Sequence, residues 1–82
     1  MNLRCSSAAL EDYQYWKEYD RRTMRRIHSI LKDIEHPHTA RGTSIKLSGS
    51  LGSWYSRRID RTHCMVYRIC DGTIEILQLR RR

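Results

Sequence analysis

The spacing of apolar residues changes once along this chain, and that change constrains the fold more than any other feature. Apolar side chains first recur at helical spacing, as Met24, Ile27, Ile30, Leu31 and Ile34. From residue 54 onward the period falls to two, which is typical of strands in an antiparallel sheet. Helices therefore come first and strands follow, a division that is typical of an α+β fold.

Local signals predict where the elements begin and end. Ser6 or Ser7 can cap a first helix, Asp20 can cap a second, and Pro37 ends the second helix. Residues 71–72 form an Asp-Gly pair, which predicts a hairpin turn. The expected strands are residues 1–6, 54–60, 64–70 and 73–79, with at most a short strand at 45–47.

The expected order is one strand, two helices and then a run of strands. Strands joined by tight turns pair antiparallel. We therefore expect an α+β fold in which two N-terminal helices pack on one face of a three- or four-stranded antiparallel sheet. A chain of 82 residues leaves no room for a second core, so residues 1–82 are expected to form a single domain.

The charge of the chain predicts an anionic partner. It carries sixteen Lys and Arg against nine Asp and Glu, a formal net charge of +7. Residues 41–82 hold nine basic and three acidic residues, whereas residues 1–40 hold seven and six. Most of the basic residues are arginines, whose planar fork clamps phosphate through two parallel hydrogen bonds. We therefore expect a nucleic-acid partner, bound mainly by the second half of the chain.

Other classes of protein are disfavoured. No apolar run approaches the roughly 20 residues of a membrane span, and the first ten residues lack the apolar stretch of a signal peptide. We therefore expect a cytoplasmic protein with no membrane partner. Cys5, Cys64 and Cys70 are too widely spaced for a metal knuckle or a disulfide framework, and His36 and His38 lack a third ligand nearby. We expect neither a metal nor a cofactor.

Arginines and aromatic residues interleave in residues 54–68, the run that is most informative about function. Side chains on a strand point alternately to its two faces, so at most one of Arg57 and Arg58 can address a ligand on an open face. The alternative is a solvated surface with cross-strand ion pairs, made for example by Arg58 or Arg61 with nearby carboxylates.

Three segments of the chain match the pattern of a known family. They are Glu11-Asp12-Tyr13-x-Tyr15-Trp16, Ile30-Leu31-Lys32-Asp33-Ile34 and Ser56-Arg57-Arg58-Ile59-Asp60-x-x-His63-x-x-Val66-Tyr67-Arg68. Together they resemble the YoeB/Txe branch of the RelE toxin superfamily, over nearly the whole chain. The resemblance implies a RelE/YoeB-like, microbial-RNase-like fold. It also implies a toxin of a type II toxin–antitoxin module that inhibits translation. The implied activity is that of an mRNA interferase, a metal-independent and ribosome-dependent endoribonuclease that cuts mRNA at the ribosomal A site. The partners it implies are a cognate antitoxin, the ribosome and mRNA, with a homodimer as a further possibility.

This chain departs from the family at the residues that carry the chemistry. Such a ribonuclease needs a base for the ribose 2′-OH, a cation for the phosphorane and an acid for the leaving 5′-oxygen. The resemblance places a glutamate before the sheet, an arginine after the sheet histidine and a C-terminal His-Tyr pair. The chain instead has Ile45, Cys64 and an arginine tail at residues 80–82.

Basic side chains are the candidates that are left for the site. The expected catalytic residues are Arg58, Lys46 and Arg80. The expected RNA-binding residues are Arg57, Arg58, His63, Arg68, Arg81 and Arg82. His63 has an alternative role as a turn histidine that makes structural hydrogen bonds.

Two other functions stay open beside the ribonuclease. The chain can be a catalytically degenerate homologue that binds RNA, the ribosome or an antitoxin without cutting. It can also be a gyrase-directed toxin of the related ParE type, although the Ser-Arg-Arg-Ile run at residues 56–59 argues against this. Ribonuclease activity is favoured over both.

Overall fold

Two helices and five short strands make up the chain, as a computed structural model describes for residues 2–36, 42–49 and 52–80. In order they are β1 (Asn2–Cys5), α1 (Ser7–Tyr19), α2 (Arg21–Glu35), β2 (Ile45–Lys46), β3 (Tyr55–Arg58), β4 (Cys64–Cys70) and β5 (Thr73–Gln78). The succession of one strand, two helices and a run of strands confirms the predicted α+β fold class. The sequence predicted at most a short strand near residues 45–47, and that strand is present as β2.

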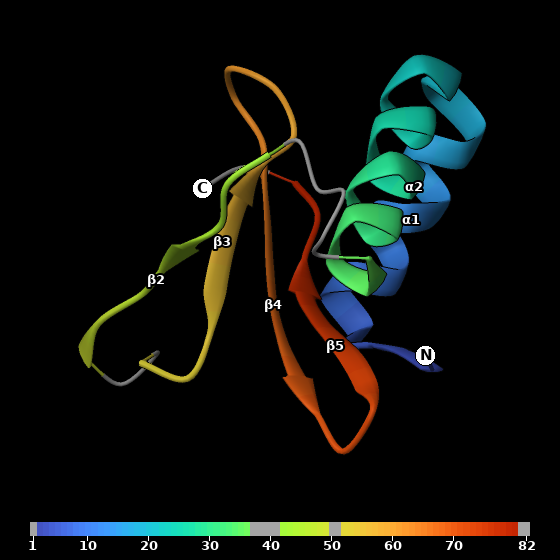
Figure 1. Cartoon of the computed structure of the whole chain (residues 1–82). Coiled ribbons are helices and arrows are strands. Elements are labelled where there is room, and N and C mark those ends of the chain that lie inside the picture. Colours follow the sequence, from blue (N-terminus) through green and yellow to red (C-terminus); the bar gives the residue numbers. More distant parts are fainter. Residues whose placement is uncertain (1, 37–41, 50–51, 81–82) are drawn as a thin grey trace.

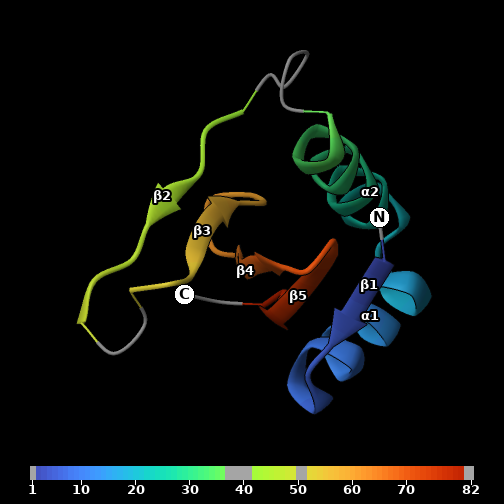
Figure 2. The same ribbon diagram turned by 60° about the horizontal axis from the view of Figure 1, so that its bottom comes forward.

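The five strands form one sheet in the order β1-β5-β4-β3-β2. Strands β2 to β5 pair antiparallel with their sequence neighbours (Figure 1), whereas β1 pairs parallel with β5 (Figure 2). The expected sheet of three or four antiparallel strands is therefore wrong in strand number and in the direction of β1. Tight turns dictate the direction of neighbouring strands, but β1 and β5 are far apart in the sequence and no local pattern sets their relative direction.

Both helices lie on the same side of the sheet, as predicted (Figures 1 and 2). Ser6 caps α1, because its hydroxyl oxygen accepts a hydrogen bond from the Ala9 amide at 3.0 Å and its hydroxyl donates to the Leu77 carbonyl at 2.7 Å. The cap thus ties α1 to β5. Asp20 caps α2 by accepting from the Thr23 amide at 3.1 Å, and this bond lowers the pKa of Asp20. Neither described helix is long and apolar enough to cross a membrane.

The core lies between the helices and the central strands. Its largest fully buried side chains are Ile27, Met65, Ile74 and Leu79, from α2, β4, β5 and the residue that follows β5. Trp16 of α1 joins them and donates from Nε1 to the Leu79 carbonyl at 3.0 Å. The C-terminal end of β5 is therefore fastened to α1.

The two faces of the sheet differ in what covers them. Met65 and Tyr67 pack in the core, and Arg57 reaches Asp33 of α2, so these side chains point toward the helices. Because side chains alternate along a strand, the residues between them point the other way. We call that other side the open face; on β3 and β4 it carries Ser56, Arg58, Cys64, Val66 and Arg68.

Candidate nucleic-acid interface

Arg58 is the cation that the fold presents on the open face at the end of β3. Its backbone pairs with Cys64 of β4, and its side chain is exposed. The structure shows no hydrogen bond or ion pair between the Arg58 side chain and any other residue that it describes. Its guanidinium is therefore available to an external anion.

The positions where the resemblance expects a glutamate and an arginine lie on the same face. Ile45 pairs with Ser56, and Cys64 pairs with Arg58. Residues paired directly across two strands share a face, so Ile45 and Cys64 both lie on the open face with Arg58. Ile45 is 67% exposed and offers no proton acceptor. The fold thus brings together the positions where the resemblance expects the glutamate and the arginine, but residue 45 is not a carboxylate.

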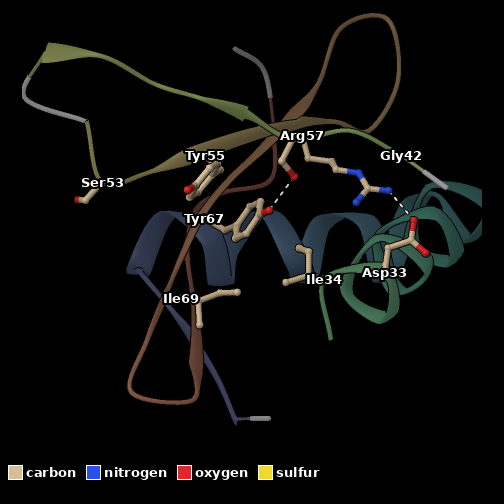
Figure 3. A pocket seen from close by; sticks show the side chains of 9 residues that line it. Asp33, Ile34, Gly42, Ser53, Tyr55, Arg57, Tyr67 and Ile69 are labelled. Carbon is tan, nitrogen blue, oxygen red and sulfur yellow. Dashed lines mark hydrogen bonds and ion pairs between the residues drawn. The ribbon is translucent and has the colours of Figure 1, made fainter. Parts of the chain in front are cut away.

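Lys46 lies on the face opposite to Arg58. It pairs with Tyr55, whose side chain lines a hollow beside α2 (Figure 3). By alternation, Lys46 and Tyr55 share the helix-side face, away from Arg58. The structure therefore does not bring Lys46 and Arg58, two of the three expected catalytic residues, together on one face of the sheet.

Arg57 is a buried partner of α2. Its side chain is only 9% exposed and donates from a terminal nitrogen to an Asp33 carboxylate oxygen at 2.5 Å (Figure 3). Gly42 leaves room for this guanidinium, which a Cβ at that position would meet directly. Arg57 therefore stabilises the packing of α2 on β3, and its guanidinium is occupied within the fold.

The hollow above this ion pair has a volume of about 540 Å³ and lies on the helix side of the sheet. Tyr55 and Tyr67 stack on its wall with ring centroids 5.8 Å apart, and the Tyr67 hydroxyl lies 2.6 Å from that of Ser44 (Figure 3). A second hollow, of about 170 Å³, lies on the open face beside Trp54 and Arg68. The hollow by Tyr55 is the larger of these two, but it lies on the face opposite to the exposed Arg58. We therefore do not place the chemistry in it.

Arg80 follows β5 and stacks on α1. Its guanidinium carbon lies 3.9 Å from the centre of the Tyr15 ring. Its Nε is buried and has no hydrogen-bond partner within the described part of the chain. No hydrogen bond or ion pair between described residues joins Arg80 to Arg58. Arg81 and Arg82, which were also expected to bind RNA, lie outside the described residues.

His63 closes the turn between β3 and β4. Its amide donates to the Asp60 carboxylate at 2.7 Å, and its ring meets the Trp16 ring edge-on at a centroid distance of 4.9 Å. Partial burial opposes ionisation of Asp60, but the amides of Thr62 and His63 outweigh it and hold the pKa of Asp60 below its usual range. These contacts are those of the turn histidine that the sequence allowed as an alternative. Because Asp60 organises this turn, β3 ends at Arg58, two residues earlier than expected.

Arg68 lies in a row of side chains that crosses the open face. Its Nε donates to Glu75 at 2.5 Å, and Arg4 lies 3.3 Å from the other Glu75 oxygen. The hydrogen bond from Arg68 is the main cause of a lowered pKa at Glu75, and the charge of Arg4 adds to it. The guanidinium of Arg68 also covers the Trp54 ring, 4.5 Å from its centre. Cross-strand ion pairing was the alternative interpretation of this run, with Arg58 or Arg61 as examples; in the structure Arg68, which was expected to bind RNA, makes the pair.

Possible metal ligands do not gather in the described residues. No three His, Cys, Asp or Glu side chains lie there in a group that could hold an ion. All three cysteines are free thiols, and burial raises the pKa of Cys5. No described thiol or carboxylate is therefore placed as a metal ligand.

The contact between Trp54 and Arg68 is the feature of the open face that the sequence analysis missed. The pair stands fourteen positions apart in the sequence, and only the strand register brings the two side chains together. The interleaving of arginine and aromatic residues was a signal for it. Without the register, that signal could not identify which arginine meets which ring.

Comparison with known proteins places this fold and sequence in one group. Residues 5–82 match the model of a family described as the YoeB-like toxin of bacterial type II toxin–antitoxin systems. The toxin YoeB of Streptomyces coelicolor is 38% identical over 81 residues, which cover 98% of this chain and 96% of that protein. Two solved structures from Staphylococcus aureus are each 32% identical and cover 100% of this chain and 97% of theirs. They are a YoeB dimer, with a TM-score of 0.89, and a heterotetrameric YoeB–YefM toxin–antitoxin complex, with a TM-score of 0.90.

Proposed function

The chain belongs to the family of YoeB-like toxins of bacterial type II toxin–antitoxin systems, and from that membership we propose that it is a ribosome-dependent endoribonuclease that cuts mRNA. One observation carries the proposal: the exposed Arg58, whose side chain has no partner among the described residues, lies on the open face beside the positions where the family's glutamate and arginine are expected. The formal charge of +7 supports attraction to RNA.

The reaction is an internal phosphoryl transfer. The ribose 2′-oxygen attacks the adjacent phosphorus as its proton leaves, and the 5′-oxygen of the next nucleotide departs and takes up a proton. Negative charge accumulates on the phosphorane oxygens in between, where a positioned cation contributes most. We assign that role to Arg58. Arg80 and the residues of the tail stay candidates for phosphate binding.

Among the described residues, the open face offers no carboxylate that is ready to act as a base. Glu75 is the carboxylate in the cross-sheet row of the open face, and its two oxygens are held by Arg68 and Arg4. Its pKa is lowered, chiefly by the hydrogen bond from Arg68, so it is a weak proton acceptor at neutral pH. Cleavage by this chain therefore depends on positioning and charge stabilisation, with the ribosome orienting the 2′-OH.

The partners follow from the relatives. Staphylococcus aureus YoeB is described in a complex with YefM and as a dimer. We propose that this chain likewise binds a cognate antitoxin, forms a homodimer, and acts in the cytoplasm on the ribosome and its mRNA. The formal net charge of +7 is consistent with these anionic targets.

A second candidate function is supported by the substitutions themselves. Because Ile45 and Cys64 stand at the two catalytic positions on the open face, the chain can bind RNA, the ribosome or the antitoxin without cutting. Expression of the chain with and without an antitoxin reading frame from the neighbouring DNA separates the two functions. Growth arrest with new RNA ends inside codons supports cleavage, whereas arrest with intact transcripts supports binding alone.

Restoring the family residues should raise the cleavage rate. Ile45→Glu adds a base and Cys64→Arg a second cation, both on the open face beside Arg58. An evolved acid or base contributes about 10²- to 10⁴-fold, and we expect about tenfold from an installed one whose surroundings are not tuned to it. The measurement is the single-turnover rate on programmed ribosomes.

The control for this variant is Lys46→Glu with Cys64→Arg, which places the carboxylate one residue away and on the other face. The carboxylate at position 46 should not raise the cleavage rate. If neither the native chain nor the restored variant cuts, the non-cutting function is correct.

A further inference from the structure

A straight row of side chains crosses the open face at the end away from Arg58. Arg4 pairs with Glu75 between β1 and β5, and Glu75 pairs with Arg68 between β5 and β4. The register of β3 and β4, in which Tyr55 pairs with Tyr67, places Trp54 opposite Arg68. Residues paired in this way share a face, so the four side chains form one line on the open face.

Two planar groups stack at the end of this row. The Arg68 guanidinium lies over the Trp54 ring at 4.5 Å, and its side chain is 38% exposed. Glu75 holds the Arg68 Nε at 2.5 Å, which restrains the guanidinium against the ring. A hollow of about 170 Å³ lies beside the pair, and its lining includes all four side chains of the row. The stack is therefore held in place and has open space next to it.

A nucleobase is the ligand that fits a stacked pair of this kind. Unpaired RNA bases stack on aromatic rings and on the planes of arginine guanidinium groups. The positive charge of Arg68 adds attraction for the π-face of the base and for its phosphate. A protein partner would need an apolar anchor pocket, whereas three of the four side chains in this row are charged.

The distance between this row and Arg58 matches the length of a short RNA strand. Trp54 immediately precedes β3 and Arg58 ends it, so they stand four residues apart, which corresponds to about 13 Å at the rise of an extended chain. A short single strand can cover that distance, with a phosphate at Arg58 and a neighbouring base at the stacked pair. The open face is thus built for a phosphate at one end and a base at the other.

We propose that Trp54 and Arg68 form a stacking platform for an unpaired base of the RNA strand that Arg58 contacts. The proposal rests on the proposed function for the identity of the strand, but it requires binding only and not cleavage. Glu75 is a positioning residue, because it holds Arg68 in place. The platform contacts the face of the base rather than its hydrogen-bonding edge. It therefore favours purines, whose larger rings stack over a larger area.

Tryptophan fluorescence tests the platform without reference to cleavage. The chain has two tryptophans, and Trp16 is 5% exposed in the core. Titration of the whole protein with a short oligoadenylate should quench the emission of Trp54, and oligouridylate should quench it less. Inorganic tripolyphosphate, which has no base, should not quench it. In Trp54→Phe the quenching by oligoadenylate should disappear.

Arg68 is tested with a matched pair of variants. Arg68→Met should weaken oligoadenylate binding by about tenfold, and Arg68→Lys, which keeps the charge but loses the plane, by nearly as much. Arg4→Met is the control, because Arg4 contacts the same carboxylate but its side chain is 73% exposed and not on the ring. Circular dichroism melting checks that each variant is folded.

The outcomes separate the platform from the proposed function. Oligoadenylate binding that leaves Trp54 emission unchanged, or equal losses in folded Arg4→Met and Arg68→Met, overturns the platform even if mRNA is cut on ribosomes. Quenching that depends on Trp54 and Arg68 supports the platform even if no cleavage is found.

Discussion

Replacing Arg58 with alanine is expected to slow mRNA cleavage on the ribosome by about 100-fold. Arg58 is exposed on the open face, has no partner among the described residues, and stands beside positions 45 and 64. Removing one preorganised donor from a developing oxyanion typically costs about 10²- to 10³-fold in rate. The loss should appear in the single-turnover rate at saturating ribosomes, because binding is shared among many other cations.

The matched control for Arg58 is Arg22→Ala. Both substitutions remove one exposed arginine and one unit of charge, but Arg22 lies on α2, on the other side of the sheet. Its cleavage rate should stay close to that of the native chain. Equal losses in the two variants would show that net charge alone matters, and Arg58 would then have no place in the site.

Replacing Arg57 with methionine is expected to lower the free energy of unfolding by about 3 kcal/mol. The Arg57 side chain is 9% exposed and pairs with Asp33 at 2.5 Å. Removing one partner of a buried ion pair typically costs about 3 to 5 kcal/mol, and the lower figure applies because the Asp33 side chain keeps 19% exposure. Urea unfolding followed by circular dichroism measures the change.

Arg58→Met is the control for Arg57→Met, since it makes the same chemical change one residue along the same strand. Its free energy of unfolding should move by less than about 0.5 kcal/mol, as is usual for exposed positions. Arg57→Met should thus lower the free energy of unfolding, whereas substitution of Arg58 should lower the cleavage rate and leave the stability nearly unchanged. If Arg57→Met is as stable as the native chain and binds RNA less tightly, Arg57 is an RNA ligand, as the sequence analysis expected.

Local sequence signals were sufficient to predict most of the secondary structure. The helical spacing from Met24 to Ile34 predicts α2, and the Asp-Gly pair at residues 71–72 predicts the hairpin between β4 and β5. Capping signals also held, because Ser6 and Asp20 cap the two helices as expected. Each of these features depends on residues that lie close together in the sequence.

Long-range pairing could not be predicted in the same way. Nothing in residues 2–5 indicates that β1 runs parallel to β5 rather than forming an antiparallel edge. The two residues of β2 are likewise too few to show a period of two, and they form a strand because β3 pairs with them. Both features depend on contacts between segments that are distant in the sequence.

The candidate site was likewise predictable where it depends on local sequence and not where it depends on long-range contacts. Alternation along the strand established that Arg57 and Arg58 face opposite ways, but not which of them faces solvent. Asp33 decides this, because it draws Arg57 under α2 and leaves Arg58 on the open face. Alternation in β2 also separates Lys46 from Arg58, a consequence that requires the pairing of Lys46 with Tyr55.

Ribonuclease activity is tested by mapping RNA ends after the purified chain is incubated with ribosomes that carry a defined mRNA. We expect a cut within the A-site codon, no cut in the same mRNA without ribosomes, and about 100-fold less product with Arg58→Ala. Intact mRNA after prolonged incubation with the native chain, under conditions in which it binds the ribosome, would contradict the claim that this protein is a ribonuclease.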